Sequence, residues 1–193
     1  MESMTISDRW HDPDRLLTVE DLEDLPPGDD RRYELDDGVL IVSPAPLNIH
    51  QFAVGRLSFI LMRACPDGLA VLPGVGINIT RFQHRIPDVA VVPADSINAK
   101  FEERPPLLAV EVSSGSTRLY DRNRKKDVYE GFGIPAYWII VPDRDRRRLI
   151  AFELRDGKYE QVADVSGDEQ FHAALPFPVT ISPATLVRTG PLD

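Results

Sequence analysis

Apolar side chains recur at helical spacing in one long segment of the chain. Over residues 48–64 they lie three or four positions apart, so that they would line one face of a helix. A second helix is predicted over residues 119–130, because the glycines that follow favour a C-terminal cap and Pro135 cannot continue a helix. Thr18, followed three positions later by Asp21, predicts the start of a short third helix.

Short runs rich in β-branched residues predict the strands of a sheet. Residues 89–92 and 107–112 are apolar except for Glu111, a composition typical of buried central strands. The Asp36-Asp37-Gly38 segment predicts a tight hairpin turn. The remaining strands are predicted over residues 33–35, 39–42, 69–72, 75–80, 137–141, 148–154 and 177–181. The whole pattern predicts one α/β (α+β) domain in which helices flank a mixed central β-sheet.

Length and composition limit the chain to one folded unit. It has 193 residues, of which 42% are hydrophobic and 27% charged, as in ordinary globular domains. Residues 1–17 are polar and aperiodic and predict a flexible acidic arm, residues 18–185 predict the single domain, and residues 186–193 predict a tail. The single cysteine excludes an internal disulfide and favours a reducing, cytoplasmic compartment. The sequence contains no run of about 18 apolar residues, the length that a membrane-spanning helix needs. We therefore expect no membrane partner.

The negative charge of the chain is concentrated at its beginning. The net charge is −9, and residues 1–40, with 13 acidic and 4 basic side chains, account for all of it. Residues 41–193 carry 18 side chains of each sign. The acidic composition is therefore a property of residues 1–40, and it does not exclude a nucleic-acid partner for the remainder of the chain.

Glu111 is the least expected residue in the sequence, because it interrupts an otherwise apolar run. An unpaired carboxylate in a buried strand would cost several kcal/mol. A basic partner, a metal ion or a cleft at the strand edge would each compensate for this cost, and a purely structural ion pair is an equally open interpretation. Glu111 is therefore a candidate site residue whose partner the pattern does not identify.

A second carboxylate precedes the neighbouring predicted strand. The chain has four Pro-Asp dipeptides, and of these Pro87-Asp88 is the one followed by an apolar strand and then by the strand that carries Glu111. Carboxylates on neighbouring strands suit Mg²⁺ or Mn²⁺, which use one or two protein carboxylates together with water and phosphate oxygens. One cysteine and four scattered histidines show no zinc-binding spacing.

The second helix carries a locally basic segment. Asp121, Lys125 and Tyr129 are spaced four residues apart and share one helix face. Residues 116–126 contain five bases and one acid. The surrounding basic residues are Arg118, Arg122, Arg124 and Lys126. The segment is either a solvated helix face or a surface that attracts a phosphate backbone and directs an ammonium group at it.

Taken in order, these residues resemble the Uma-type restriction endonuclease family of the PD-(D/E)XK nuclease superfamily. The matching positions are Tyr33-Glu34-Leu35-Asp36-Asp37-Gly38, Ser43-Pro44, His50, Pro87-Asp88, Glu111-Val112-Ser113-Ser114, Ser116-Thr117, Asp121, Lys125, Tyr129, Gly133-Ile134-Pro135 and Tyr137-Trp138. The resemblance covers roughly residues 18–185 and implies a restriction-endonuclease-like core. The family's usual Ser-Pro-Ser-Thr segment is Ser114-Gly115-Ser116-Thr117 in this chain, which loosens that loop but removes no ligand.

The resemblance assigns roles to individual residues. Asp88 and Glu111 match the two metal-ligating acids, and the third motif position, normally lysine, is Ser113. Lys125 on the following helix matches the lysine that takes over this catalytic role, and Glu34 matches an additional catalytic acid. His50 and Tyr129 match further positions, which we assign to substrate binding together with the basic residues Arg118, Arg122, Arg124 and Lys126.

We therefore expect a metal-dependent endonuclease that uses Mg²⁺ or Mn²⁺ to hydrolyse phosphodiester bonds in DNA. Because cutting a duplex takes two active sites, a homodimer is also expected. One alternative is a catalytically inactive nuclease-fold module that binds nucleic acid or a protein partner. Another is a small-molecule hydrolase, which would have a closed pocket in place of an open cleft.

Deleting residues 1–16 should tighten DNA binding at low salt, because the acidic arm would compete with phosphate for the cleft. Fluorescence anisotropy of a labelled duplex measures the change, and equal affinities for the full-length and shortened chains would contradict this role for the arm.

Overall fold

A computed structural model describes residues 15–23, 31–43, 45–113, 119–143 and 145–190. The helices are α2 (Val19–Glu23), α3 (Asn48–Ala64), the short 3₁₀ helix η1 (Ala94–Asn98) and α4 (Leu119–Phe132). The strands are β1 (Arg32–Asp36), β2 (Val39–Ser43), β3 (Leu69–Pro73), β4 (Ile77–Thr80), β5 (Gln83–Arg85), β6 (Val89–Pro93), β7 (Leu108–Val112), β8 (Ala136–Val141), β9 (Arg148–Arg155), β10 (Lys158–Ser166), β11 (Phe171–Ala173) and β12 (Val179–Ile181).

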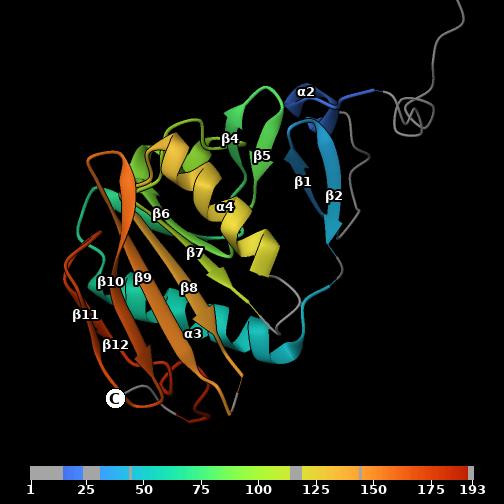
Figure 1. The fold of residues 1–193 in the computed structure, drawn as a ribbon. Coiled ribbons are helices and arrows are strands. Elements are labelled where there is room, and N and C mark those ends of the chain that lie inside the picture. The colour runs from blue at the N-terminus through green and yellow to red at the C-terminus, as the bar shows by residue number, and fades with distance from the viewer. Residues whose placement is uncertain (1–14, 24–30, 44, 114–118, 144, 191–193) are drawn as a thin grey trace, which may run out of the picture.

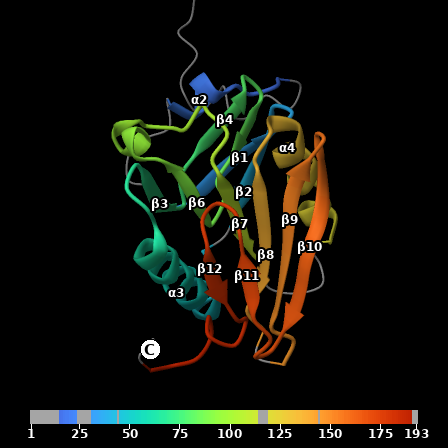
Figure 2. The same ribbon diagram turned by 90° about the vertical axis from the view of Figure 1, so that its left-hand side faces the viewer.

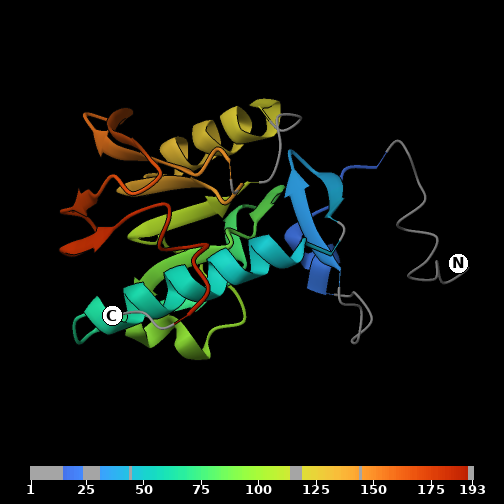
Figure 3. The same ribbon diagram turned by 90° about the horizontal axis from the view of Figure 1, so that it is seen from below.

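A six-stranded mixed sheet forms the centre of the fold, with the order β10-β9-β8-β7-β6-β3. Strands β7 and β8 run parallel, and the other neighbours in this sheet are antiparallel. The parallel pair is connected through α4, which makes β7, α4 and β8 one crossover unit. Figures 1 and 3 show α4 on one face of the sheet and α3 on the other, which confirms the predicted mixed α/β architecture.

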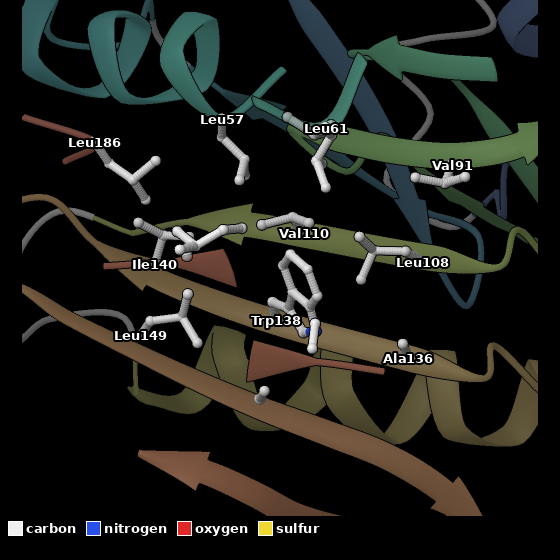
Figure 4. Close-up of a cluster of buried hydrophobic side chains, with 14 of the residues drawn as sticks. Leu57, Leu61, Val91, Leu108, Val110, Ala136, Trp138, Ile140, Leu149 and Leu186 are labelled. Atoms are coloured by element: carbon white, nitrogen blue, oxygen red, sulfur yellow. The ribbon is translucent and has the colours of Figure 1, made fainter. Parts of the chain in front are cut away.

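The larger apolar cluster lies between the sheet and α3. Leu57 and Leu61 of α3 are fully buried and face Val110 and Trp138 of the sheet, as Figure 4 shows. The two-stranded sheet formed by β11 and β12 covers the same face beside α3 (Figure 2). Its Phe171 meets Trp138 edge to face at 5.4 Å between ring centroids. The opposite face packs a second cluster of aromatic residues under α4.

A separate four-stranded sheet, with the order β2-β1-β5-β4, adjoins this body. Its β1–β2 hairpin turns at Asp37 and Gly38, whose φ angles are +49° and +81°. Positive φ at both positions is the geometry of the tight turns that Asp-Gly favours. Leu35 of β1 is fully buried in a small third cluster with Leu17 and Leu22, so this layer has its own apolar centre.

The short helix α2 begins as the sequence predicts. Asp21 accepts hydrogen bonds from the Thr18 backbone N–H at 2.8 Å and from the Thr18 hydroxyl at 3.0 Å. Both bonds run from Thr18 to the Asp21 carboxylate, which gives the Thr18 N–H a partner at the start of the helix. Arg15 forms an ion pair with the same carboxylate at 2.6 Å.

Most predicted elements are present with small shifts of their ends, and the differences fall at polar segments and at the termini. Strand β5 was not predicted, because Gln83-His84-Arg85 contains no apolar residue. Leu17, which we placed in the arm, is buried, and its N–H bonds the Gly38 carbonyl at 2.8 Å. Leu186, which we placed in the C-terminal tail, is fully buried in the main cluster. The described domain therefore extends slightly beyond the predicted limits at both ends.

None of the helices in the described ranges is long and apolar enough to cross a membrane.

The substitution Leu61→Ala should lower the free energy of unfolding by about 2–5 kcal/mol, because it leaves a cavity under α3. Its neighbour Met62 is 51% exposed, so Met62→Ala is a matched control that should change stability by less than about 0.5 kcal/mol. Urea unfolding followed by circular dichroism measures both values. Equal losses in the two variants would contradict the packing of α3 on the sheet.

Candidate active site

Asp88 lies at the entrance of β6, opposite the end of β7. Val89 pairs with Val110 in the antiparallel ladder, and continuing this register by one step places Asp88 across from Glu111. The two carboxylate oxygens of Asp88 have different partners. Oδ2 accepts the Val112 N–H at 2.7 Å and lies 3.1 Å from His50 Nε2, whereas Oδ1 lies 2.6 Å from Arg32 Nη1.

These partners keep Asp88 ionised although its side chain is only 5% exposed. Burial by itself would raise the pKa of Asp88, because it penalises the charged form. The hydrogen bond and charge of His50, together with the Val112 N–H and the Arg32 guanidinium, outweigh burial and hold the pKa below its usual value. The predicted motif aspartate is therefore a fixed, negatively charged group.

Glu111 projects from β7 toward α4, and the partner that the sequence pattern left open is Lys125. The Lys125 ammonium lies 3.2 Å from each carboxylate oxygen of Glu111. The hydroxyl of Tyr129, one helical turn further along α4, donates to Glu111 Oε1 at 2.8 Å. The predicted i, i+4 spacing of Lys125 and Tyr129 thus brings both side chains to the same carboxylate.

Glu34 joins the same ammonium from the opposite side. Its Oε1 lies 3.1 Å from Lys125 Nζ and also accepts the Ile86 N–H at 2.8 Å. Lys125 therefore connects β1, β7 and α4 within a buried cluster.

The environment of Glu111 differs from that of Asp88. Burial raises the pKa of Glu111 to about 7, against the opposing effect of Lys125, and the negative charges of Asp88 and Glu34 raise it further. Burial and the adjoining Glu111 likewise raise the pKa of Tyr129 well above its usual range, so its hydroxyl remains a hydrogen-bond donor. The pKa of Glu111 thus depends on the charges of Asp88 and Glu34, so the three carboxylates interact electrostatically.

Strand β1 delivers three charges to this region from one face. Arg32, Glu34 and Asp36 alternate along the strand, and alternate residues of a strand point to the same side. Arg32 pairs with Asp88, Glu34 with Lys125, and Asp36 with Arg124. The sequence offered one signal for Arg32, its two-residue spacing from Glu34, but nothing in the pattern identified Asp88 as its partner.

A buried arginine, Arg85, was also missed. Its side chain is 1% exposed, and its Nη2 lies 2.6 Å from Asp36 Oδ1. Its Nε and Nη1 atoms find no hydrogen-bond partner among the described residues. Arg85 faces Glu34 across the β1–β5 register, since Leu35 pairs with His84, and its positive charge therefore offsets part of the negative charge of the hairpin.

Two of the basic residues predicted to bind substrate, Arg124 and Lys126, contact residues outside the carboxylate cluster. Arg124 donates to Asp36 at 3.1 Å and pairs with Asp37, so it attaches α4 to the hairpin. The Lys126 ammonium lies 4.4 Å from the centre of the Phe152 ring, away from the carboxylates. Arg118 and the side chain of Arg122 lie outside what the structure describes. The structure thus joins Asp88, Glu111, Lys125, Glu34, His50 and Tyr129 in one site, but not Arg124 and Lys126.

The donor set at this site fits a hard divalent cation. No group of three His, Cys, Asp or Glu side chains within the described ranges forms a complete metal cage, but Mg²⁺ commonly takes only one or two carboxylates. Asp88 and Glu111 supply such oxygens. Of the neighbouring residues, His50 already contacts Asp88 through Nε2, and Ser113, two positions after Glu111, has a buried hydroxyl without a partner among the described residues.

Comparison with known proteins identifies the family. The sequence model of the family described as "Uma2: Putative restriction endonuclease" matches residues 19–186. The chain belongs to the Uma2 family. This finding confirms the resemblance deduced from the motifs, and the matched range includes all the site residues described above. The departure of this Uma2 chain from the family pattern, Gly115 in the loop after Glu111, lies outside the described residues.

A solved structure confirms the fold of this Uma2 chain. The crystal structure of a "putative nuclease belonging to DUF820" from Anabaena variabilis matches with a TM-score of 0.69 at 16% sequence identity, covering 89% of this chain and 97% of that chain. A cryo-electron microscopy structure of the DrdV–DNA complex matches with a TM-score of only 0.33 at 13% identity, covering 63% of this chain and 12% of that chain. Among curated proteins, none matches the chain.

The raised pKa of Glu111 gives the stability of the protein a defined pH dependence. A carboxyl group with a raised folded-state pKa stabilises the fold fully below its usual pKa of 4.5, and this contribution is lost as the pH rises through about 7. Glu111→Gln removes the titration while Lys125 keeps Glu34. The variant should therefore be more stable than the wild type by about 1–3 kcal/mol at pH 8 and equally stable near pH 4.5.

Urea unfolding in the presence of a chelator measures this difference. Glu102→Gln is a matched control, because Glu102 is also a buried carboxylate but its partner is Arg104. A stability difference for Glu111→Gln that stays constant between the two pH values would show that Glu111 has an ordinary pKa.

Proposed function

We propose that this Uma2 protein is a metal-dependent endonuclease that hydrolyses phosphodiester bonds in DNA with Mg²⁺ or Mn²⁺. The observation that carries the proposal is the convergence of Lys125 on Glu111 and Glu34 beside Asp88. Family membership supports a nuclease, and the metal and the DNA substrate are parts of the proposal. Carboxylates that repel one another in a buried site, one of them with a raised pKa, are typical of functional sites.

Asp88 and Glu111 are the residues that would hold the ion. When bound, a divalent cation lowers the pKa of a coordinated water and neutralises phosphate oxygens. Asp88 is suited to this task because its pKa is lowered and it stays ionised. Glu111 must give up its proton or its contact with Lys125 to act as a ligand, and a nearby positive charge favours its ionised form.

Lys125 is the group that would act on the reacting atoms. Its ammonium is held by two carboxylates from different elements, so its position is fixed before substrate arrives. A fixed positive charge stabilises the negative charge that accumulates on the phosphate in the transition state, and it also orients the attacking water. Tyr129 restrains Glu111, and His50 restrains Asp88, through one hydrogen bond each.

The contacts with the substrate and the assembly of the protein are further parts of the proposal. Arg118 and Arg122 are proposed to attract the DNA backbone, because they belong to the basic segment over residues 116–126. A homodimer would provide the two sites that a double-strand cut requires. A cytoplasmic location, where DNA and reduced thiols coexist, fits the single cysteine.

Asp88→Asn, Glu111→Gln and Lys125→Gln should each reduce Mg²⁺-dependent cleavage of plasmid DNA by about 100-fold or more, because each removes a charge from the reacting centre. Gel electrophoresis of supercoiled, nicked and linear forms measures the rates. A chelator should abolish the wild-type activity, and an RNA of matched length tests the preference for DNA.

Glu102→Gln serves as the control, since it neutralises a buried carboxylate that belongs to the Arg104 ion pair. It should leave the cleavage rate within about twofold of the wild type. Wild-type activity in the Asp88 or Glu111 variant would overturn the assignment, as would complete inactivity of the wild-type protein on DNA with both metals.

A further inference from the structure

Arg32 links the buried carboxylates to the surface of the protein. Its side chain is 34% exposed, whereas the Asp88 side chain with which it pairs is 5% exposed. The other cation of the site, Lys125, is 10% exposed. Arg32 is therefore the more accessible of the two cations to a large substrate that approaches from solvent, such as a nucleic acid.

The two oxygens of Asp88 are held with different strength. Oδ2 has two partners that belong to the interior, the Val112 N–H and the His50 ring. Oδ1 has the contact with the Arg32 guanidinium at 2.6 Å. A change at Oδ1 thus disturbs no backbone hydrogen bond, and Oδ1 is the oxygen of Asp88 that can exchange one positive partner for another.

We propose that Arg32 is a substrate-binding residue that moves from Asp88 Oδ1 to a phosphate oxygen of the nucleic acid when Asp88 takes a divalent cation. The inference rests on the proposed function. A guanidinium and a divalent cation at one carboxylate oxygen repel each other. A guanidinium released in this way offers a planar pair of donors that matches phosphate geometry.

The backbone of β1 can stay in place while the Arg32 side chain moves. Arg32 remains paired with Ser43 in the β1–β2 ladder. Glu34 and Asp36, on the same strand face, keep their separate contacts with Lys125 and Arg124. The exchange therefore requires only a rotation of one long side chain about its own bonds, and the rest of the site keeps its geometry.

Calorimetric titration with Mn²⁺ alone tests the first half of the exchange without any nucleic acid. Arg32→Gln removes the competing cation, so the variant should bind Mn²⁺ about three- to tenfold more tightly than the wild type. Arg81→Gln is the matched control, because Arg81 is 66% exposed and pairs with Glu20 at 3.5 Å. It removes the same charge and should leave the Mn²⁺ affinity within about twofold.

Fluorescence anisotropy with a duplex oligonucleotide tests the second half. In Ca²⁺, a hard cation that also binds carboxylates, Arg32→Gln should weaken binding about fivefold to tenfold relative to the wild type. In a chelator, where Arg32 stays on Asp88, the two proteins should bind alike within about twofold. The metal dependence of the loss separates the exchange from a general effect of removing one positive charge.

Equal Mn²⁺ affinity in the wild type and in Arg32→Gln would overturn the exchange, even if the wild type cleaves DNA. An equal loss of DNA binding with and without Ca²⁺ would also overturn it. Tighter Mn²⁺ binding together with a metal-dependent loss of DNA binding would support the exchange, even if the wild type cuts nothing and the proposed endonuclease activity fails. The two proposals are therefore tested separately.

Discussion

The ammonium group of Lys125, held between Glu34 and Glu111, is the interaction on which the remainder of the candidate site depends. It joins a hairpin strand, 91 positions away in the sequence, to a central strand and the helix that follows it. A buried ion pair contributes little to net stability, but leaving one of its charges without a partner costs several kcal/mol. These three elements must therefore come together in a single arrangement, and the position of the ammonium is set by folding.

The charges around this ammonium lie close together in a buried site. Asp88, Glu34 and Glu111 are three carboxylates whose partners include Arg32, Lys125 and His50. Burial, together with repulsion from Asp88 and Glu34, raises the pKa of Glu111. The apolar packing of the sheet against α3 has to offset this cost. An added cation would favour the ionised form of Glu111.

Sequence patterns predicted the parts of the structure that periodicity controls. The helix over residues 48–64 and the strands around Asp88 and Glu111 follow from apolar spacing. The four-residue spacing on the second helix singled out Lys125, and the family resemblance added Glu34. The all-polar strand β5 gave no such signal. Arg32 was missed because its partner, Asp88, lies 56 positions away. Helical spacing identifies neighbours on one helix, but it does not show which residues of other elements face them, and so the contact of Arg124 with Asp36 was not predicted.

The small apolar cluster under the hairpin has a consequence for how the protein fluctuates. Leu17, Leu22 and Leu35 form a centre separate from the two clusters on the main sheet, and ion pairs attach this layer to α4 and β6. We expect such a layer to open as a unit, at a lower free energy than the central sheet. Its opening would separate Glu34 and Arg32 from the site, whereas Glu111 and Lys125 would stay together because both belong to the β7-α4-β8 crossover unit. Backbone amides of β1 should then exchange hydrogen with solvent faster than those of β7. The difference between the two exchange rates should depend on ionic strength, because salt screens the ion pairs that attach the layer.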